Sequence, residues 1–501
     1  MLLLRELLDA DRILSAHGSL ERPVGRITTD SREVAPGDLF VCLPGYRSDG
    51  GETRADRHDF IPAAVAAGAA GLIVERDIAP IEGVSIVRVA DAWATLAALA
   101  ARFHGRPSRE LELVGVTGTS GKTSTTYFIE AVLAARHARV ARLGTIEYRL
   151  GDRVVAAAQT TPEAPLLQGL LRAAVAAGCT AAVMEVSSHA LALQRVAEVD
   201  FDVAVFTNLS HDHLNFHADM DDYRRAKGRL FEGLGGGGKH GTAVVNADDP
   251  AGAFMLAATR ATALTYGLGP GADVRATALH TDLHGARFLA ATPRGSIAIS
   301  LRHLGDYSVY NALAGLATGV ALGLELDAIA AALAQAPPVP GRFELVDAGQ
   351  DFVVAVDYAH KPDALQRLLE SARRLQPRRL IVVFGCGGDR DRSKRPVMGR
   401  IAAGLADYTV VTSDNPRSEP PQAIIDEILA GVCAVDTAGA RSVAEPDRAR
   451  AIAHAIEVAG PGDIVLIAGK GHEPYQLIAG QRFDFDDRLV ARAALQRQAA
   501  R

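Results

Sequence analysis

The sequence predicts an α/β protein built from three domains. Short runs rich in valine, isoleucine and leucine alternate with helical patterns along most of the chain, which is typical of mainly parallel sheets. The 501 residues are too many for one hydrophobic core. Two breaks, at 105–108 and at the proline-rich 337–341, interrupt the pattern. We therefore predict domains over residues 1–106, 107–340 and 341–501.

The expected elements follow this division. An alanine-rich run at 94–101 reads as a helix, and a strand over 111–116 is followed by a helix over 123–136. After the second break the strand and helix pattern begins again, as in a dinucleotide-binding fold. The further strands are predicted at 181–186, 203–207, 352–356, 380–385, 408–412 and 463–468, with a helix at 363–375.

Composition limits the partners and the compartment. Basic and acidic residues nearly balance, 53 against 59 for a net charge of -6, which argues against nucleic acid or an anionic membrane as the main partner. The four cysteines are widely spaced, which disfavours a disulfide framework or a zinc site and suits a cytoplasmic protein. The N-terminus lacks a signal-peptide pattern, and no uninterrupted apolar stretch is long enough to span a bilayer. We expect a monomer that binds small molecules.

A glycine-rich turn between the strand at 111–116 and the next helix predicts a phosphate-binding loop. It reads Gly118-Thr119-Ser120-Gly121-Lys122-Thr123-Ser124. Glycines let backbone N–H groups approach phosphate oxygens, and the helix N-terminus adds donors and a favourable dipole. Lys122 is expected to pair with the β- and γ-phosphates of ATP, and Thr123 to ligate Mg²⁺. The loop departs from the commonest pattern, because Val116 stands where a glycine is usual.

Other polar residues have both a functional and a structural interpretation. Glu185 follows an apolar strand, where a buried carboxylate is costly unless it binds a metal or an ion-pair partner. Lys227, on an expected helix, reads by itself as a solvated charge. Arg342 and Asp357 read as hinge ion pairs, and Asp-Asn-Pro at 414–416 reads as a turn.

The motifs, taken together and in order, resemble the Mur ligase family of ATP-dependent amide ligases in peptidoglycan precursor synthesis. The resemblance extends along the whole chain. It rests on Asp30–Arg32, Pro36–Phe40, Gly118–Thr123, Thr160–Pro162, Met184–His189, Thr207–His213, Pro340–Arg342, Asp357–His360, Gly385–Pro396, Asp414–Arg417 and Gly469–Glu473.

The resemblance implies a UDP-MurNAc-binding α/β domain, a central P-loop ATPase-like domain and a C-terminal Rossmann-like domain that binds the amino acid. It implies that ATP phosphorylates a carboxylate and that an amine then attacks the acyl phosphate. Its implied catalytic residues are Lys122, Glu185, His213 and Lys227, the last as a carbamylated lysine; its Mg²⁺ ligands are Thr123, Glu185, His213 and Lys227. ATP is expected at Gly118–Ser124, Asn311, Arg342 and Asp357.

The remaining implied contacts concern the two other substrates. UDP-MurNAc-L-Ala-D-Glu is expected at Thr29, Ser31, Tyr46, Arg47, Ser48, Gln159, Thr160, Thr161, Ser187 and Arg195. The amino acid is expected at Arg390, Asp414, Asn415, Pro416, Arg417, Gly469 and Glu473.

Arg417 indicates which amino acid is added. The segment Asp414–Arg417 is similar to that of family members that add meso-diaminopimelate, whereas members that add L-lysine lack the arginine. Diaminopimelate differs from lysine by a second carboxylate at its far end, and a guanidinium group matches a carboxylate with two parallel hydrogen bonds.

Two other functions share parts of this pattern. A folylpolyglutamate synthase-like ligase shares the central architecture, but the expected UDP-sugar domain and the Asp414–Arg417 segment argue against it. A GTPase-like switch shares the phosphate loop, but the sequence has no guanine-reading Asn-Lys-x-Asp segment, and such a switch leaves the third domain unexplained.

Overall fold

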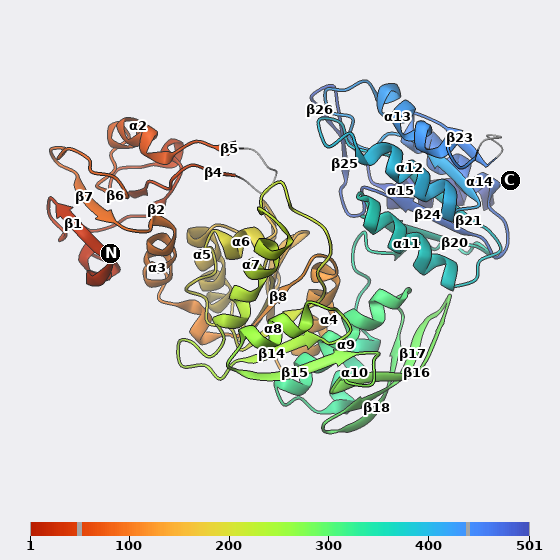
Figure 1. Ribbon diagram of the computed structural model, residues 1–501, viewed down its shortest axis with the longest axis horizontal. Helices are drawn as coiled ribbons and strands as arrows, with labels where there is room; N and C mark the ends of the chain where they lie inside the picture. The colour runs from red at the N-terminus through yellow and green to blue at the C-terminus, as the bar shows by residue number, and fades with distance from the viewer. Residues whose placement is uncertain (1, 48–52, 437–440, 500–501) are drawn as a thin grey trace. The chain divides into compact units, whose positions relative to one another are not determined.

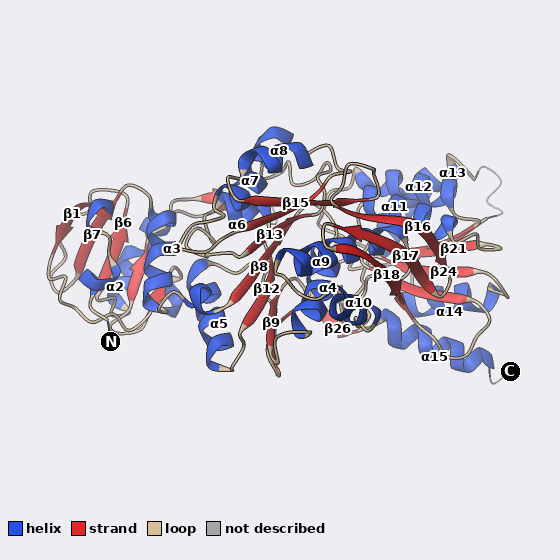
Figure 2. Ribbon diagram, turned by 90° about the horizontal axis from the view of Figure 1, so that it is seen from below, coloured by secondary structure: helices blue, strands red, loops and turns tan. Residues whose placement is uncertain are grey.

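The computed structural model describes residues 2–47, 53–436 and 441–499, and the chain divides into two compact units (Figure 1). The first unit contains Met1–Thr277, Leu289–Ile297 and Tyr310–Leu333. The second contains Ala278–Phe288, Ala298–Val309 and Ala334–Arg501. In both units helices flank the strands (Figure 2), so the predicted α/β class is confirmed. No helix in the described part of the chain is long and apolar enough to cross a membrane.

The first unit begins with a five-stranded sheet in the order β1-β7-β6-β3-β2. Its inner strands are buried on both faces, because α1 and α3 pack on one face and α2 packs on the other. Asp91 caps α3 by accepting a hydrogen bond from the Ala94 N–H. The elements are α1 (Leu4–Leu7), β1 (Ile13–His17), β2 (Ile27–Thr28), β3 (Leu39–Val41), β4 (Tyr46–Arg47), β5 (Thr53–Arg54), α2 (Ile61–Ala66), β6 (Gly71–Val74), β7 (Ser85–Val89) and α3 (Ala92–Phe103).

The central sheet runs in the order β11-β10-β9-β12-β8-β13-β14-β15-β16-β17-β18. From β9 to β16 neighbouring strands are parallel, whereas β10 and β11 add an antiparallel edge. The strands are β8 (Glu112–Thr117), β9 (Val140–Leu143), β10 (Glu147–Leu150), β11 (Arg153–Ala156), β12 (Ala181–Glu185), β13 (Val203–Phe206), β14 (Thr242–Asn246), β15 (Thr262–Gly267), β16 (Val274–Asp282), β17 (Gly285–Thr292) and β18 (Gly295–Leu301).

Helices cover both faces of this sheet. On one face α5, α7 and α8 bury a large hydrophobic cluster. Elsewhere α9 approaches α4 closely, since a Cβ added at Gly315 would lie 3.3 Å from the Cβ of Phe128. The helices are α4 (Lys122–Ala134), α5 (Ala164–Ala176), α6 (Ser188–Ala192), α7 (Met220–Glu232), α8 (Gly252–Ala258), α9 (Asp306–Ala321) and α10 (Leu326–Ala334).

The second unit is built on a six-stranded sheet in the order β19-β20-β24-β21-β22-β23, parallel except for β19. Helices α11, α12 and α13 cover one face, and α14 and α15 cover the other. The elements are β19 (Glu344–Leu345), β20 (Val353–Asp357), α11 (Pro362–Arg374), β21 (Leu380–Phe384), α12 (Lys394–Leu405), β22 (Tyr408–Val411), α13 (Pro421–Cys433), β23 (Ser442–Ala444), α14 (Arg448–Val458), β24 (Ile464–Ala468), β25 (Tyr475–Ile478), β26 (Gln481–Asp484) and α15 (Asp487–Ala499).

The strands and helices predicted after residue 110 are present, with ends shifted by one or two residues. The antiparallel strands β10 and β11 and the hairpin β25–β26 were not predicted. The proline-rich segment 337–341 forms neither helix nor strand. The bounds of the three domains stay a prediction.

Candidate active site

The phosphate loop joins β8 to α4 with two glycines in backbone conformations that favour glycine. Gly118 has a φ of 151° and Gly121 a φ of 85°. A Cβ at Gly118 would lie 1.9 Å from the Oγ1 of Thr207, and a Cβ at Gly121 would lie 2.8 Å from the Oδ1 of Asn311. The loop therefore needs glycine at both positions, whereas Val116 is a buried strand residue.

The segment after β13 holds this loop in place. Asn208 accepts a hydrogen bond from the Ser120 N–H at 2.9 Å and donates one to the Ser120 carbonyl at 3.0 Å. The Thr119 N–H donates to the Asn208 carbonyl at 2.8 Å. Sequence analysis gave Asn208 no role; its only signal was a polar residue at the carboxyl end of a buried strand.

Two lysines converge on one carbonyl oxygen of the loop. Lys122 Nζ donates to the Gly118 carbonyl at 2.9 Å, and Lys227 Nζ donates to the same oxygen at 2.8 Å. The Lys227 residue is only 1% exposed, and its Nζ lies 4.4 Å from the ring centroid of Tyr223. Burial lowers the pKa of Lys227 well below that of an ordinary lysine, and the charge of Lys122 lowers it further. This environment favours a neutral amine at Lys227.

The other predicted metal ligands lie around the same edge of the sheet. Glu185 ends β12, opposite Val116 of β8, and accepts hydrogen bonds from the N–H and Oγ1 of Thr145 at 2.8 and 3.1 Å. The ring of His213 lies 5.9 Å from that of Tyr223, which neighbours Lys227. Within residues 2–47, 53–436 and 441–499, no three His, Cys, Asp or Glu side chains are grouped as a metal site.

The four predicted ligands fit Mg²⁺ in part; they are Thr123, Glu185, His213 and Lys227. The carboxylate of Glu185 and the hydroxyl of Thr123 are the oxygen donors that Mg²⁺ prefers. His213 is a nitrogen donor, and an ammonium group at Lys227 would repel the ion. A carbamate at Lys227 would supply the anionic oxygen that the set requires.

Glu163 joins two residues that were predicted to bind the UDP-sugar. It accepts hydrogen bonds from the Oγ1 of Thr29 at 3.1 Å and from the hydroxyl of Tyr46 at 3.3 Å. The ring of Tyr46 packs edge-on against Trp93, with centroids 4.9 Å apart. Glu163 was not among the predicted site residues, because an acidic residue before α5 resembles an ordinary helix start.

The residues that were predicted to bind the dipeptide lie close to Glu185. Thr161 donates from its hydroxyl to the Glu185 carbonyl at 2.8 Å and accepts from the Ser187 N–H at 3.0 Å. Arg195 is buried and donates to the Thr161 carbonyl at 3.1 Å. Thr160 shares a hydrogen bond of 3.0 Å with Thr145, between their hydroxyls. Thr161 and Arg195 thus hold the segment that presents Thr160.

A cavity of about 520 Å³ lies beside these residues and is lined by Thr29, Gln159 and Glu163 among others. Of the other predicted contacts, Ser31 begins a short 3₁₀ turn capped by Asp30, and Arg47 lies in β4. Ser48 lies outside the described residues.

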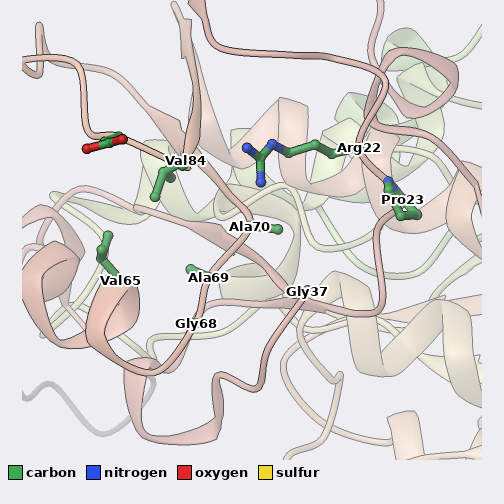
Figure 3. Close-up of a pocket in the computed structure, with 10 residues that line it drawn as sticks. Arg22, Pro23, Gly37, Val65, Gly68, Ala69, Ala70 and Val84 are labelled. Carbon is green, nitrogen blue, oxygen red and sulfur yellow. The ribbon is translucent and has the colours of Figure 1, made fainter.

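A second cavity, of about 490 Å³, lies under Arg22 (Figure 3). Its wall is formed largely by Gly37, Gly68–Ala70 and Val84, which precede strands β3, β6 and β7. Ligands of parallel sheets bind at the carboxyl ends of strands, which is the opposite edge. This cavity contains none of the predicted site residues.

In the second unit, Asp357 ends β20 and accepts hydrogen bonds from the Phe343 and Ala359 N–H groups, both at 2.8 Å. Burial raises the pKa of Asp357, and the charge of Arg342 opposes this rise. The Arg342 guanidinium lies 4.9 Å from the ring centroid of Tyr358. The two residues therefore lie close together, and their predicted contact with ATP stays a prediction.

Asp414–Arg417 follows β22 and places groups of both charges at the carboxyl edge of the sheet. Arg417, with a left-handed φ of 53°, donates from Nη1 to the Gly388 carbonyl at 2.8 Å. A Cβ at Gly387 would lie 2.9 Å from that Nη1 and 3.8 Å from the Cγ of Arg390. The two arginines therefore flank the same backbone turn.

The acidic side of this site is formed by Asp414 and Glu473. Glu473 accepts hydrogen bonds from the Nδ2 of Asn415 at 3.0 Å and from the hydroxyl of Tyr358 at 3.2 Å. Gly469 has a φ of 117°, and a Cβ there would lie 2.8 Å from the Oδ2 of Asp414. The structure brings together the residues predicted to bind the amino acid.

Comparisons with known proteins cover almost the whole chain. Three family models match in order: "Mur ligase family, catalytic domain" over residues 23–104, "Mur ligase middle domain" over 116–319, and "Mur ligase, glutamate ligase domain" over 341–471.

Curated relatives named UDP-N-acetylmuramoyl-L-alanyl-D-glutamate–2,6-diaminopimelate ligase match closely. The protein of Geobacillus kaustophilus is 47% identical over 93% of this chain and 94% of its own length. That of Gloeobacter violaceus is 48% identical over 95% of each chain. A solved structure of a ligase of this name superposes with a TM-score of 0.71, at 33% identity over 99% of each chain. The chain thus belongs to the Mur ligase family.

Proposed function

We propose that the protein uses ATP to join meso-2,6-diaminopimelate to the D-glutamate γ-carboxylate of UDP-N-acetylmuramoyl-L-alanyl-D-glutamate, with release of ADP and phosphate. The relatives that match almost the whole chain carry the name of this ligase. The reaction supplies a precursor of peptidoglycan. We place it in the cytoplasm and expect a monomer.

The observation that carries the choice of amino acid is the presence of groups of both charges around Asp414–Arg417. Arg417 and Arg390 flank the Gly387 turn, whereas Asp414 and Glu473 both lie within 4.0 Å of Lys470 Nζ. The far end of diaminopimelate carries one carboxylate and one ammonium group. A guanidinium fork matches the carboxylate, and the acidic pair matches the ammonium. L-Lysine offers only the ammonium.

The amide bond requires an activated acid, because hydroxide is a poor leaving group. Transfer of the γ-phosphoryl group of ATP to the γ-carboxylate gives an acyl phosphate, and attack by the amine expels phosphate. Both steps bring anions together, so fixed cations and donors stabilise them. Lys122 supplies the cation, and the N–H groups at the start of α4 supply the donors. Bound Mg²⁺ would neutralise phosphate charge, held by Thr123, Glu185, His213 and carbamylated Lys227.

The burial of Lys227 supports the carbamate. Carbon dioxide reacts with a neutral amine, and burial favours that form because it lowers the pKa of Lys227 well below that of an ordinary lysine. A new N–C bond forms and one proton is released to solvent. The product is an anion beside the ammonium group of Lys122, so the two side chains attract each other.

The test is a phosphate-release assay with purified protein. Phosphate should appear only when ATP, UDP-MurNAc-L-Ala-D-Glu and meso-diaminopimelate are all present. Equal release with L-lysine would contradict the assignment of Arg417. Hydrolysis of GTP without either amine would contradict the ligase function itself.

A further inference from the structure

Lys470 is a buried cation in the middle of the proposed amino-acid site. It is 0% exposed, and its Nζ donates to the Oδ1 of Asn415 at 3.2 Å. The same nitrogen lies 3.6 Å from Glu473 Oε2 and 4.0 Å from Asp414 Oδ1. A buried ammonium group costs several kcal/mol of desolvation unless its partners compensate it. Here all three partners are residues assigned to substrate binding.

Lys470 determines which way the Asn415 amide faces. The Oδ1 of Asn415 accepts from Lys470 Nζ and from the Leu477 N–H at 2.9 Å. A flipped amide would turn its NH₂ group against both donors. Since the oxygen is held, Nδ2 donates to Glu473 Oε2 at 3.0 Å. The orientation of Glu473 therefore depends on Lys470 through Asn415 as well as directly.

Lys470 also sets the charge of the site. A second buried pair, Arg448 with Asp487, lies nearby and is neutral in sum, with two contacts of 2.7 Å. Arg448 donates to the Ser413 and Ala468 carbonyls, next to Asp414 and Gly469. Lys470 then offsets one of the two negative charges of Asp414 and Glu473. One negative charge is left for one substrate ammonium.

We propose that Lys470 is a positioning residue for the amino-acid substrate. It holds Asp414, Asn415 and Glu473 in the arrangement that receives the distal ammonium group, and it limits their net charge to one. Lys470 itself is fully buried, so it acts on the substrate through these three side chains and not by direct contact. The proposal rests on the function proposed above.

The test measures KM for each substrate in K470M, an apolar replacement of similar length. The KM for meso-diaminopimelate should rise tenfold or more, while the KM for ATP stays within twofold. K470R, which keeps the charge, should recover part of the loss. The matched control is K239M, since Lys239 is also largely buried beside one carboxylate, Asp202, but lies in the first unit, next to Leu111 before β8. K239M should leave both KM values unchanged in folded protein.

A pH profile separates positioning from a merely structural role. The titratable and charged groups around Lys470 are Asp414, Arg448, Glu473, Tyr475 and Asp487. Without Lys470, two carboxylates face each other, which favours protonation of one of them. Protonation of one carboxylate brings the net charge of the site in K470M back to one, so the ratio of kcat/KM for diaminopimelate, K470M over wild type, should rise as the pH is lowered from about 9 to about 6. The titration of the attacking amine affects both enzymes equally, so it cancels in this ratio.

The outcomes are distinct. A folded K470M enzyme with an unchanged KM for diaminopimelate overturns the proposal, and so does a pH-independent ratio or an equal rise in the KM for ATP. If K470M does not fold, K470R is tested instead. A planar guanidinium group cannot place one nitrogen among Asp414, Asn415 and Glu473, so the KM for diaminopimelate should still rise. An unchanged KM for diaminopimelate in K470R overturns the proposal. A wild-type enzyme inactive with diaminopimelate instead overturns the proposed function.

Discussion

Replacing Arg417 by alanine should remove the group that binds the second carboxylate of the amino acid. Its Nη1 is directed along the Gly387–Gly388 backbone, beside Arg390. Loss of a charged bidentate pair costs about 2–4 kcal/mol. That corresponds to about 30- to 1000-fold in kcat/KM for meso-diaminopimelate. The KM for ATP should not change.

L-Lysine provides the internal comparison. It lacks the second carboxylate, so its low kcat/KM should be nearly the same with and without Arg417. Discrimination between the two amines should therefore collapse, measured as initial rates of phosphate release with each. Arg392→Ala is the matched control, because Arg392 is an exposed arginine in the loop that carries Gly387 and Arg390, where it pairs with Glu427. An equal loss with both amines, or no loss with diaminopimelate, would refute the reasoning.

Three further predictions concern other parts of the molecule. Gly118→Ala should weaken ATP binding at least tenfold by calorimetry, because its Cβ would lie 1.9 Å from Thr207 Oγ1 and displace the loop; normal binding would show that the loop adapts. Lys227 should give a carbamate signal in ¹³C NMR with labelled bicarbonate, and Lys227→Ala should be inactive; an active variant would exclude the carbamate. Burial by itself would raise the pKa of Asp463, but its ion pairs with Arg378 and Arg379 lower this pKa to about 2. The ion pairs therefore stabilise the fold fully above pH 3.8, and this stabilisation is lost as the pH falls towards 2. Asp463→Asn should lower the urea midpoint at pH 7, with a difference that narrows only below about pH 4; a constant difference down to pH 3 would contradict the assignment.

The phosphate loop and the buried strands were predictable because their signals are local. A strand, a glycine turn and a helix start are contiguous around Gly118–Lys122, and β12 and β24 are short apolar runs buried on both faces. The segment Asp414–Arg417 was informative because its residue types match a specific ligand.

The residues that hold the site together were not predictable. Asn208, Glu163 and Lys470 act on partners far away in the sequence or on side chains whose orientation only the fold fixes. By themselves they resemble a turn residue, a helix start and a solvated charge, respectively. The burial of Lys227 could not be predicted from the sequence either, since a lysine on a helix is usually exposed.

The most direct test of the account is a competition between two amines. Purified enzyme receives ATP and UDP-MurNAc-L-Ala-D-Glu together with equal concentrations of meso-diaminopimelate and L-lysine, and the nucleotide product is identified by mass spectrometry. The account predicts a product that carries diaminopimelate almost alone. A product in which lysine is present in comparable amount would contradict it.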